Sequence, residues 1–379
     1  MRVLFLTDGI YPFQLGGMQR HSSILCREFA RRGLNLEVVH CGGTDYSKEA
    51  FKSQFESDRI KEVHVVFPKT DSLPGHYIRE SKKYSKNIFE SVKARLNDFD
   101  LVYAQGLTAW YFLKMKKRGA AVPPVFANLH GLNMFQQAFG TRAKVENKLL
   151  TPISKYILLN ADYVFSFGGK LDELLLDLGV GKKKILLQRN GVETAMIVDQ
   201  PKRLGNSLKR LVFVGRNDKV KGFDMLLSAF KKVSAHKDIE LSVIGPFDQN
   251  EFGFVEGVSY LGEIRDHGQL MSLIGEHDCL ISSSYSEGLP LAILEAMSQG
   301  LAIIGTDVGA TASLIDGNGL LVKQPTEKDL YKAIETVLEL TSDELDHMKL
   351  KSLEKVNKEF VWSTIIDEQI KLIRTALSS

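Results

Sequence analysis

Short apolar runs alternate with amphipathic segments along the first half of the chain. The run at residues 3–6 is followed by residues 19–32, where apolar side chains recur at helical spacing until Gly33. Further β-branched or aromatic runs lie at residues 36–40, 63–67, 101–104, 125–129, 163–167 and 185–188. Strands that alternate with helices form parallel, doubly wound sheets. The pattern therefore predicts one such sheet in the first half.

A second alternation begins at residue 210, after a segment that shows neither period. Residues 199–209 are polar, contain Pro201 and Gly205, and predict a linker. Beyond them, helix-like segments at 223–235 and 289–299 separate apolar runs at residues 210–214, 240–244, 258–261, 279–282, 302–305 and 319–322. A second doubly wound sheet is therefore predicted.

Together the two alternations predict an α/β protein with two Rossmann-like domains that face each other across a cleft. A length of 379 residues, with 44% hydrophobic and 25% charged side chains, suits two cores. We expect a first domain at 1–198, the linker at 199–209, a second domain at 210–358, and a last helix at 359–379 that returns to the first domain. Ligands of such sheets bind outside the carboxyl ends of the strands.

The cysteines and the apolar runs indicate a cytoplasmic chain. Cys26, Cys41 and Cys279 lie far apart without a Cys-x-x-Cys pair, so they predict neither a disulfide framework nor a thiolate metal site. The amino-terminal apolar run has only four residues, too few for a signal peptide. No later run approaches the roughly 18 apolar residues that a membrane span needs.

Charge is distributed unequally between the halves of the chain. Residues 1–190 hold 29 Lys and Arg against 18 Asp and Glu, a balance of +11, whereas residues 191–379 hold 20 against 28, a balance of −8. A basic half can bind an anionic acceptor, a lipid headgroup surface or nucleic acid. The alternative is that these side chains only solvate helix exteriors.

The segment at residues 282–300 carries the most chemistry, and it predicts a strand end, a loop and a helix opening. Gly288 lets a ligand approach the backbone, and Pro290 suits the first turn of a helix. The free N–H groups at such an opening form an anion site that a diphosphate fits. Glu287 and Glu295 lie eight positions apart, slightly more than two helical turns, so both can face one ligand and contact its ribose and its sugar.

This Glu, seven residues, Glu pattern, followed by Ala-Met-x-x-Gly, resembles the motif of family 4 of the retaining glycosyltransferases, also called glycosyl transferases group 1. The resemblance extends over nearly the whole chain and implies the GT-B fold. It implies metal-independent transfer of a sugar from a UDP- or GDP-linked donor, with Glu295 on the ribose and Glu287 against the sugar. The helix opening that binds the donor would comprise Gly288, Leu289, Pro290 and Leu291.

A basic loop follows the first predicted strand of the second domain. Arg216 and Lys221 lie five residues apart there and can converge on two phosphates, the Arg as a fork and the Lys as a point charge. Members of the family carry the same Gly-Arg…Lys-Gly spacing, and the resemblance assigns both residues to the donor diphosphate. Lys219 is the weaker candidate.

Two motifs of the first domain add to the resemblance. Gly16 and Gly17 follow the first predicted strand, do not form a Gly-x-Gly-x-x-Gly fingerprint, and match a family pair that closes over the diphosphate and the acceptor. His130, at the end of a predicted strand, matches a histidine that faces the donor sugar. With Glu287 it is our candidate for the catalytic step, as a residue that orients the sugar. We do not expect it to act as a general base, because in the retaining transfer that the resemblance implies the leaving phosphate oxygen can itself take the acceptor proton. His21, His40, His64 and His76 have no comparable context.

Two further features set limits on the assignment. Asp98-Phe-Asp100 looks like an Asp-x-Asp metal clamp, but its place just before a strand favours a loop role, and no other His, Asp or Glu cluster has metal spacing. Where the family usually reads Gly-Gly-x-x-Glu, this chain has Ala310 and Ser313 in place of the second Gly and the Glu.

We therefore expect a retaining hexosyltransferase that uses a nucleotide-diphosphate sugar and no cofactor. A glycan or lipid-linked acceptor of envelope polysaccharide or lipopolysaccharide synthesis is favoured, with the basic half, notably residues 144–159, at the inner face of the cell membrane. The alternative for that segment is packing on the protein's own core. Two other functions stay open, a nucleotide-sugar 2-epimerase and a non-catalytic sugar-nucleotide-binding subunit. Nucleic-acid binding is disfavoured, because no aromatic-basic motif is present.

Overall fold

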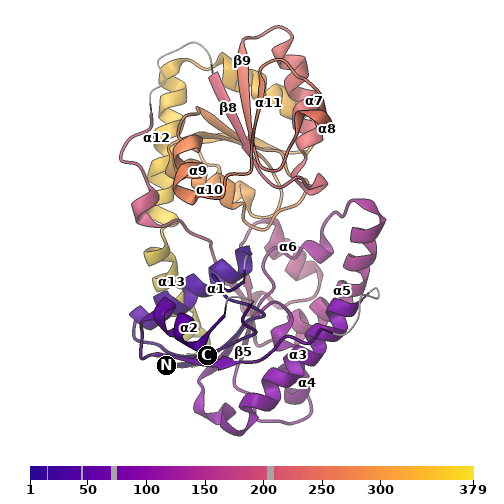
Figure 1. Ribbon diagram of the computed structural model, residues 1–379, viewed down its shortest axis with the longest axis vertical. Helices are drawn as coiled ribbons and strands as arrows, with labels where there is room; N and C mark the ends of the chain where they lie inside the picture. The colour runs from indigo at the N-terminus through magenta and orange to yellow at the C-terminus, as the bar shows by residue number, and fades with distance from the viewer. Residues whose placement is uncertain (15, 44–45, 70–74, 203–208) are drawn as a thin grey trace. The chain divides into compact units, whose positions relative to one another are not determined.

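The structure is a computed structural model that describes residues 1–14, 16–43, 46–69, 75–202 and 209–379. The chain divides into two compact units (Figure 1). The first unit contains residues 1–167, 172–188 and 366–379, and the second contains residues 168–171 and 189–365.

A seven-stranded parallel sheet forms the centre of the first unit, in the order β3-β2-β1-β4-β5-β6-β7. Its strands are β1 (Arg2–Leu6), β2 (Asn35–His40), β3 (Ile60–His64), β4 (Leu101–Gln105), β5 (Val125–Asn128), β6 (Tyr163–Ser166) and β7 (Ile185–Leu187). The inner strands β1, β4 and β5 are buried almost throughout, as expected for a parallel sheet with both faces covered. The predicted sheet is confirmed.

The second unit contains a six-stranded parallel sheet in the order β10-β9-β8-β11-β12-β13. Its strands are β8 (Lys209–Val214), β9 (Ile239–Ile244), β10 (Val258–Gly262), β11 (Cys279–Ser282), β12 (Ala302–Thr306) and β13 (Gly319–Val322). A core of Leu, Ile, Val and Phe side chains, including Phe213, Phe230 and Ile334, fills the space between this sheet and its helices. Both sheets thus have the doubly wound order that the alternation of the sequence predicts.

Helices connect the strands and cover the sheets. In the first unit they are α1 (Gly17–Arg31), α2 (Lys48–Phe55), α3 (His76–Val92), α4 (Trp110–Lys116) and α5 (Gly140–Asn160), and α6 (Lys170–Asp177) begins at the end of the second unit's short segment. In the second unit they are α7 (Phe223–Ser234), α8 (Gln249–Phe252), α9 (His267–Ile274), α10 (Leu291–Ser298), α11 (Glu327–Glu339) and α12 (Ser342–Glu359). Helices α7 and α11 pack together on one face of the second sheet, and α10 packs with α12 on the other (Figure 1).

The last helix, α13 (Trp362–Ser378), returns to the first unit as predicted. Gln369 is 1% exposed and donates a hydrogen bond from Nε2 to the hydroxyl of Tyr103 on β4, at 2.9 Å. The hydroxyl of Tyr163 on β6 donates to the carbonyl of Ala376 at 2.6 Å. The carboxyl-terminal helix is therefore part of the first unit's structure.

The division of the chain differs from the sequence prediction at three places. Residues 168–171 belong to the second unit, and the returning segment of the first unit begins at residue 366 rather than 359. Residues 189–198 were expected in the first domain, but they belong to the second unit. The reason is local pairing, because the N–H of Val198 donates to the carbonyl of Ser298, and the Gln299 amide donates to the carbonyl of Met196. Most of the predicted linker, residues 203–208, lies outside the described residues.

Within the described residues, no helix has both the length and the apolar character that crossing a bilayer requires.

Candidate functional site

In each sheet the strand order reverses at one point, and the candidate residues lie beside it. The reversal is between β1 and β4 in the first unit and between β8 and β11 in the second. Loops that leave the carboxyl ends of strands at such a switch point diverge, and the space between them is where doubly wound sheets bind ligands. The two loops of the second unit, residues 215–222 and 283–290, hold most of the predicted donor-binding residues.

These two loops are joined by hydrogen bonds to the carbonyls of the basic loop. The Ser283 hydroxyl donates to the carbonyls of Lys221 and Gly222, and the N–H of Tyr285 donates to the carbonyl of Val220. Gly222 has a φ of 65°, and a Cβ there would lie 2.1 Å from the carbonyl oxygen of Ser283. Only glycine fits this close approach, so the Lys-Gly pair of the sequence holds the basic loop against the loop that carries Glu287.

Lys221 and Glu287, predicted from separate motifs, form an ion pair. The Lys221 Nζ lies 2.6 Å from Glu287 Oε1, and the side chains are 24% and 13% exposed. The Ser284 hydroxyl donates to the same carboxylate oxygen at 2.7 Å. An incoming phosphate must therefore share Lys221 with Glu287, and Glu287 is held in one position beside the cation.

The loop around Glu287 rests on Gly309 and Ala310, of which Ala310 departs from the family pattern. The N–H of Ala310 donates to the carbonyl of Gly288 at 2.8 Å. Gly309 has a φ of 55°, and a Cβ there would lie 2.3 Å from the carbonyl oxygen of Glu287. Backbone contacts from Gly309 and Ala310 thus support the loop that carries Glu287.

Helix α10 begins directly after that loop. Leu289 and Pro290 are buried, so Leu289 can reach a ligand only through its main chain, while Leu291 is 40% exposed. Among the described residues, no side chain caps the amino end of α10, so the N–H groups of Leu291 and Ala292 are available to an anion. Arg216 lies in the other loop with an exposed side chain and no ion pair to the described residues.

Glu295 has a partner that the sequence did not indicate. Its Oε1 lies 3.0 Å from Nε2 of His267, the first residue of α9, and the side chains are 18% and 25% exposed. Nδ1 of His267 is buried and has no hydrogen-bond partner in the part of the chain that the structure describes. His267 was missed because its place beside Glu295 depends on the packing of α9 against α10, which no sequence motif records.

In the first unit, the Gly16-Gly17 turn leads into α1 near the half-buried carboxyl group of Asp8. Gly16 precedes α1 with a φ of 150°, and the space around a Cβ at Gly17 is open. Asp8, after β1, accepts a hydrogen bond from Gln19 at 3.2 Å. Burial raises the pKa of Asp8 to about 6. This carboxyl was not predicted, although its position after the first strand is a signal that could have found it.

His130 occupies a strained turn at the end of β5. Its φ is 57°, a left-handed conformation that non-glycine residues rarely adopt and that costs roughly 1–3 kcal/mol. The Asn128 side chain secures the turn, since its Oδ1 accepts a hydrogen bond from the His130 N–H at 2.9 Å. Leu132 also has a positive φ, of 53°. Strain of this kind concentrates at functional sites.

His21 lies directly against His130, which corrects the sequence analysis. The two rings meet edge to face with centroids 5.1 Å apart, and His21 is 5% exposed. Burial lowers the pKa of His130 to about 4, and burial together with His130 lowers the pKa of His21. Both rings are neutral near pH 7. His21 therefore has a context that its position in helix α1 did not reveal.

Two sequence profiles of known families match this chain. One, described as "Glycosyltransferase Family 4", matches residues 15–196, and the other, described as "Glycosyl transferases group 1", matches residues 208–340. Together they include both switch-point sites. The chain belongs to glycosyltransferase family 4.

Relatives of this family member support the same assignment. The O-antigen biosynthesis glycosyltransferase WbnH of Escherichia coli is 30% identical over 189 residues, which cover 48% of this chain and 52% of that protein. The chain thus spans about half the length of the curated relatives it matches.

Similarity to solved structures shows that this protein has the GT-B fold. Sucrose-phosphate synthase from Thermosynechococcus elongatus matches with a TM-score of 0.77 and 18% identity, over 100% of this chain and 99% of that chain. Anabaena HepE, solved in complex with UDP and glucose, matches with a TM-score of 0.69 and 18% identity, over 99% and 100%.

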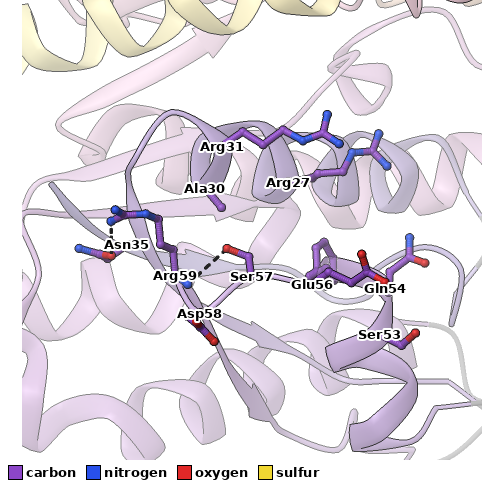
Figure 2. Close-up of a pocket in the computed structure, with 11 residues that line it drawn as sticks. Arg27, Ala30, Arg31, Asn35, Ser53, Gln54, Glu56, Ser57, Asp58 and Arg59 are labelled. Carbon is purple, nitrogen blue, oxygen red and sulfur yellow. Dashed lines mark hydrogen bonds between the residues drawn. The ribbon is translucent and has the colours of Figure 1, made fainter.

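Two surface hollows of the first unit lie outside the predicted donor site. One, of about 960 Å³, is lined by the end of α1, the start of β2 and residues 53–59. Figure 2 shows Arg59 of this hollow turned toward Asn35, with which its guanidinium forms a 3.2 Å hydrogen bond. This hollow faces the amino ends of the strands, and none of the predicted site residues lines it.

The second hollow, of about 710 Å³, lies between the start of α3 and the first half of α5. Val145 and Leu149 line it and are 52% and 39% exposed. The second half of α5 is less exposed than the first, since Ile157 and Leu158 are fully buried in the first unit. Of the two alternatives for residues 144–159, packing on the protein's own core holds for Ile157 and Leu158. Membrane contact stays a prediction for the first half of the helix.

Asp98 and Asp100 lie at the amino end of β4, away from the switch point. Asp100 accepts a hydrogen bond from the N–H of Arg2 at 2.7 Å and so joins β4 to the start of β1. Within the residues that the structure describes, no group of three or more His, Cys, Asp or Glu side chains is placed to hold a metal ion.

Proposed function

We propose that this protein is a retaining glycosyltransferase that moves a hexose from a UDP- or GDP-linked donor to a glycan or lipid-linked acceptor of envelope polysaccharide synthesis. The observation that carries the proposal is the meeting of Lys221, Glu287 and the open helix end of α10 at the switch point of the second sheet. Family membership supports the reaction class, and the UDP and glucose bound to HepE support the donor class.

The second unit can stabilise a departing nucleoside diphosphate. Arg216 and Lys221 supply two positive charges, and the first N–H groups of α10 add hydrogen bonds to the same phosphates. Charge that develops on the leaving group as the glycosidic bond breaks is thereby stabilised by groups already in place. Glu295 would accept hydrogen bonds from the ribose, with His267 holding its carboxylate.

In the proposed reaction Glu287 and His130 orient the sugar. Glu287 is fixed by Lys221 and Ser284, and the strained turn fixes the backbone of His130. Gly16 and Gly17 would approach the diphosphate and the acceptor with their backbone. The acceptor hydroxyl attacks the anomeric carbon on the face from which the diphosphate leaves, and its proton passes to the leaving phosphate oxygen.

The test is a product assay with UDP- and GDP-linked hexoses and a panel of lipid-linked and free glycan acceptors. We expect glycoside with the donor's anomeric configuration in the NMR spectrum of the product, and undiminished activity in excess EDTA. An inverted product would overturn the retaining mechanism. Complete loss in EDTA that only Mg²⁺ or Mn²⁺ restores would overturn the metal-independent one.

The same assay separates the alternatives. Isomerisation of the donor at the sugar's second carbon would identify an epimerase, and nucleotide-sugar binding without transfer or hydrolysis would identify a non-catalytic subunit. Lys221, Glu287, Arg216 and Glu295 are all present, which favours the transferase.

We also propose that the first half of α5 contacts an anionic membrane surface where a lipid-linked acceptor resides. Val145 and Leu149 are exposed beside the hollow at α3, and Arg142, Lys144 and Lys148 on the same part of the helix are exposed as well. Exposed apolar groups can enter a headgroup layer, and each nearby cation gains about 1 kcal/mol from an anionic surface.

Liposome co-sedimentation tests this contact. We expect binding to vesicles with anionic lipid, little binding to neutral vesicles, and weakening by salt. A Val145→Ser/Leu149→Ser variant should bind less, whereas Leu176→Ser, another exposed leucine of the first unit, should not change binding. Full recovery of the protein in the supernatant at low salt contradicts the proposal.

A further inference from the structure

A histidine of the second unit contacts Glu295 from a neighbouring helix. His267 is the first residue of α9, and α9 packs against α10, the helix that carries Glu295 (Figure 1). The His267 Nε2 lies 3.0 Å from Glu295 Oε1. The two side chains are 25% and 18% exposed, so water reaches this contact only in part. The pair is therefore better shielded than an ordinary surface ion pair, which water and salt screen.

The start of α9 fixes the position of His267. Asp266 caps this helix, because its Oδ1 accepts a hydrogen bond from the N–H of Gln269 at 2.7 Å. Met271 and Ile274, four and seven positions after His267, are 6% and 0% exposed. Residues at this spacing share one face of a helix. His267 therefore lies on the face of α9 that packs against the rest of the unit, at the end that the cap holds.

The chemistry of the two groups fixes which of them donates. A carboxylate offers acceptors only, so the hydrogen atom of this contact belongs to His267 Nε2. The other ring nitrogen, Nδ1, is buried and has no hydrogen-bond partner among the described residues. Buried polar atoms are nearly always paired, and an unpaired one costs folding free energy. A leucine would fill this space without that cost, so packing alone does not account for a histidine here.

Glu295 presents an open carboxylate oxygen near the beginning of α10. It follows the exposed Leu291 by one helical turn on the same face, whereas residues 293–294 and 296–297 of the helix are buried. His267 occupies Oε1 of the carboxylate. Oε2 has no hydrogen-bond partner within the described residues and is not fully buried. A ligand at the opening of α10 can therefore donate to this oxygen and to the remaining lone pair of Oε1.

The His267 contact fixes the direction of that carboxylate. A glutamate side chain turns about three bonds, so its carboxylate has no single direction when nothing holds it. A ribose presents two neighbouring hydroxyl groups, and one carboxylate can accept from both only when its two oxygens face them together. Carboxylates of dinucleotide-binding sheets accept from ribose hydroxyls in the same way. A carboxylate that is held before the ligand arrives forms both hydrogen bonds at a lower cost in entropy.

We propose that His267 is a positioning residue that turns the Glu295 carboxylate toward both ribose hydroxyls and thereby makes the site select ribonucleotides over 2′-deoxyribonucleotides. The inference rests on the proposed contact of Glu295 with the ribose. A 2′-deoxyribonucleotide lacks one donor, so the fixed carboxylate keeps an unpaired acceptor when this nucleotide binds. Without His267 the carboxylate turns toward the single remaining hydroxyl or toward water, and the two classes of nucleotide bind more equally.

Calorimetric titration of the full-length protein with UDP, GDP and their 2′-deoxy counterparts tests the proposal. We expect the natural protein to bind the ribonucleotide roughly 10- to 100-fold more tightly, the effect of one hydrogen bond to a charged group. In His267→Leu this ratio should fall below about threefold. The fall should come from weaker binding of the ribonucleotide, while the affinity for the 2′-deoxyribonucleotide stays within about twofold of the natural value.

Two further variants separate a positioning role from a structural one. His267→Gln keeps an N–H donor at a similar distance from the backbone, so most of the preference for ribonucleotides should return. His236→Leu is the matched control, because His236 Nε2 lies 3.3 Å from Glu335 Oε1 in the same unit. His236 follows the end of α7, whereas the basic loop precedes the start of that helix. This variant should leave the ratio of affinities unchanged.

The outcomes separate this inference from the function on which it rests. An unchanged ratio in His267→Leu, or an equal loss of affinity for both classes of nucleotide, overturns the positioning role alone. A natural protein that binds no nucleotide, or binds both classes equally, overturns the ribose contact of Glu295 and the inference with it. If His267→Leu does not fold, His267→Asn gives the same comparison, because its shorter side chain ends before the carboxylate.

Discussion

The two units share one strand order, yet their switch points differ in charge. In the second unit the site contains Arg216, Lys221 and two glutamates, and an ion pair of 2.6 Å is its central contact. In the first unit the corresponding region contains a neutral network around His130 and His21. The half of the chain with a balance of +11 has the neutral network, and the half with −8 has the cations. Net charge of a domain therefore does not predict the charge of its site, because most charged side chains lie on solvated helix faces.

The largest effect is expected from a charged pair of the second unit that lies outside the site. Lys349 on α12 is 1% exposed, lies 3.0 Å from Asp278 Oδ1 and donates to the carbonyl of Lys202. Lys349→Ala leaves the Asp278 carboxylate buried without its cation, so we expect a loss of roughly 3–5 kcal/mol in unfolding free energy, measured by chemical denaturation.

The matched control for this variant is Lys351→Ala on the same helix. Lys351 and its partner Glu354 are 40% and 65% exposed, and such a pair contributes roughly 0.5 kcal/mol or less. Equal unfolding free energies of Lys349→Ala and the control would show that the buried pair does not stabilise the fold. The Lys349–Asp278 pair would then not differ from the site's Lys221–Glu287 pair in its effect on stability.

Removal of the site's own cations should affect binding more than folding. Lys221→Ala and Arg216→Ala are each expected to weaken nucleotide binding and turnover by roughly 2–5 kcal/mol, because each removes a charge from the diphosphate. Calorimetric titration with UDP and GDP measures the nucleotide affinity of each variant. Lys219→Ala, in the same loop with an exposed side chain, serves as the control. Near-normal kinetics in both site variants would mean that the diphosphate binds elsewhere.

The two glutamates should separate binding from turnover. Glu295→Ala removes the proposed ribose contact, which exists before and during the reaction, so donor affinity should fall. Glu287→Ala should lower kcat roughly 10- to 100-fold, the loss of one charged hydrogen bond. It also releases Lys221 from its ion pair, so nucleotide affinity should be kept or rise. If Glu295→Ala instead lowers kcat and Glu287→Ala weakens donor binding in steady-state kinetics, Glu287 contacts the ribose and Glu295 the sugar.

The smallest effect concerns the carboxyl group at the edge of the neutral site. Burial raises the pKa of Asp8 to about 6, above the roughly 3.9 of an unfolded chain. The folded state thus favours the protonated form, and this contribution to stability is present below pH 4 and lost as the pH rises through 6. Asp8→Asn, which cannot ionise, should be more stable than the natural protein at pH 8 by about 1–2 kcal/mol and equally stable near pH 4.

Thermal unfolding at both pH values measures this difference. Asp100→Asn is the control, because Asp100 lies at the opposite end of the sheet with an exposed side chain. A gain in Asp8→Asn that is equal at pH 4 and pH 8 would indicate a packing effect rather than ionisation.

The sequence predicted the strands where burial and pattern agree. For β11 and β13 the predicted bounds match those of the structure. β11 is almost fully buried, and β13 is half-buried with its last residue, Val322, in the core. For β3 the prediction was displaced by three residues, to 63–67. Val66 is 67% exposed, and the strand is instead Ile60–His64, paired in register from Leu36–Ile60 to His40–His64. An edge strand is fixed by its neighbour's hydrogen bonds rather than by its own hydrophobicity.

The sequence by itself determined the two doubly wound sheets, the return of the last helix and the positions of Lys221, Glu287 and His130 in loops after strands. Those features depend on local periodicity and on motifs within a few residues. Only the tertiary structure decided which of the site residues contact one another. The pairs Lys221–Glu287, Glu295–His267 and His130–His21 join residues 66, 28 and 109 positions apart, and Gly309 supports a loop more than 20 residues before it. Such contacts arise because parallel strands distant in sequence end at the same edge of a sheet, which no single stretch of sequence specifies.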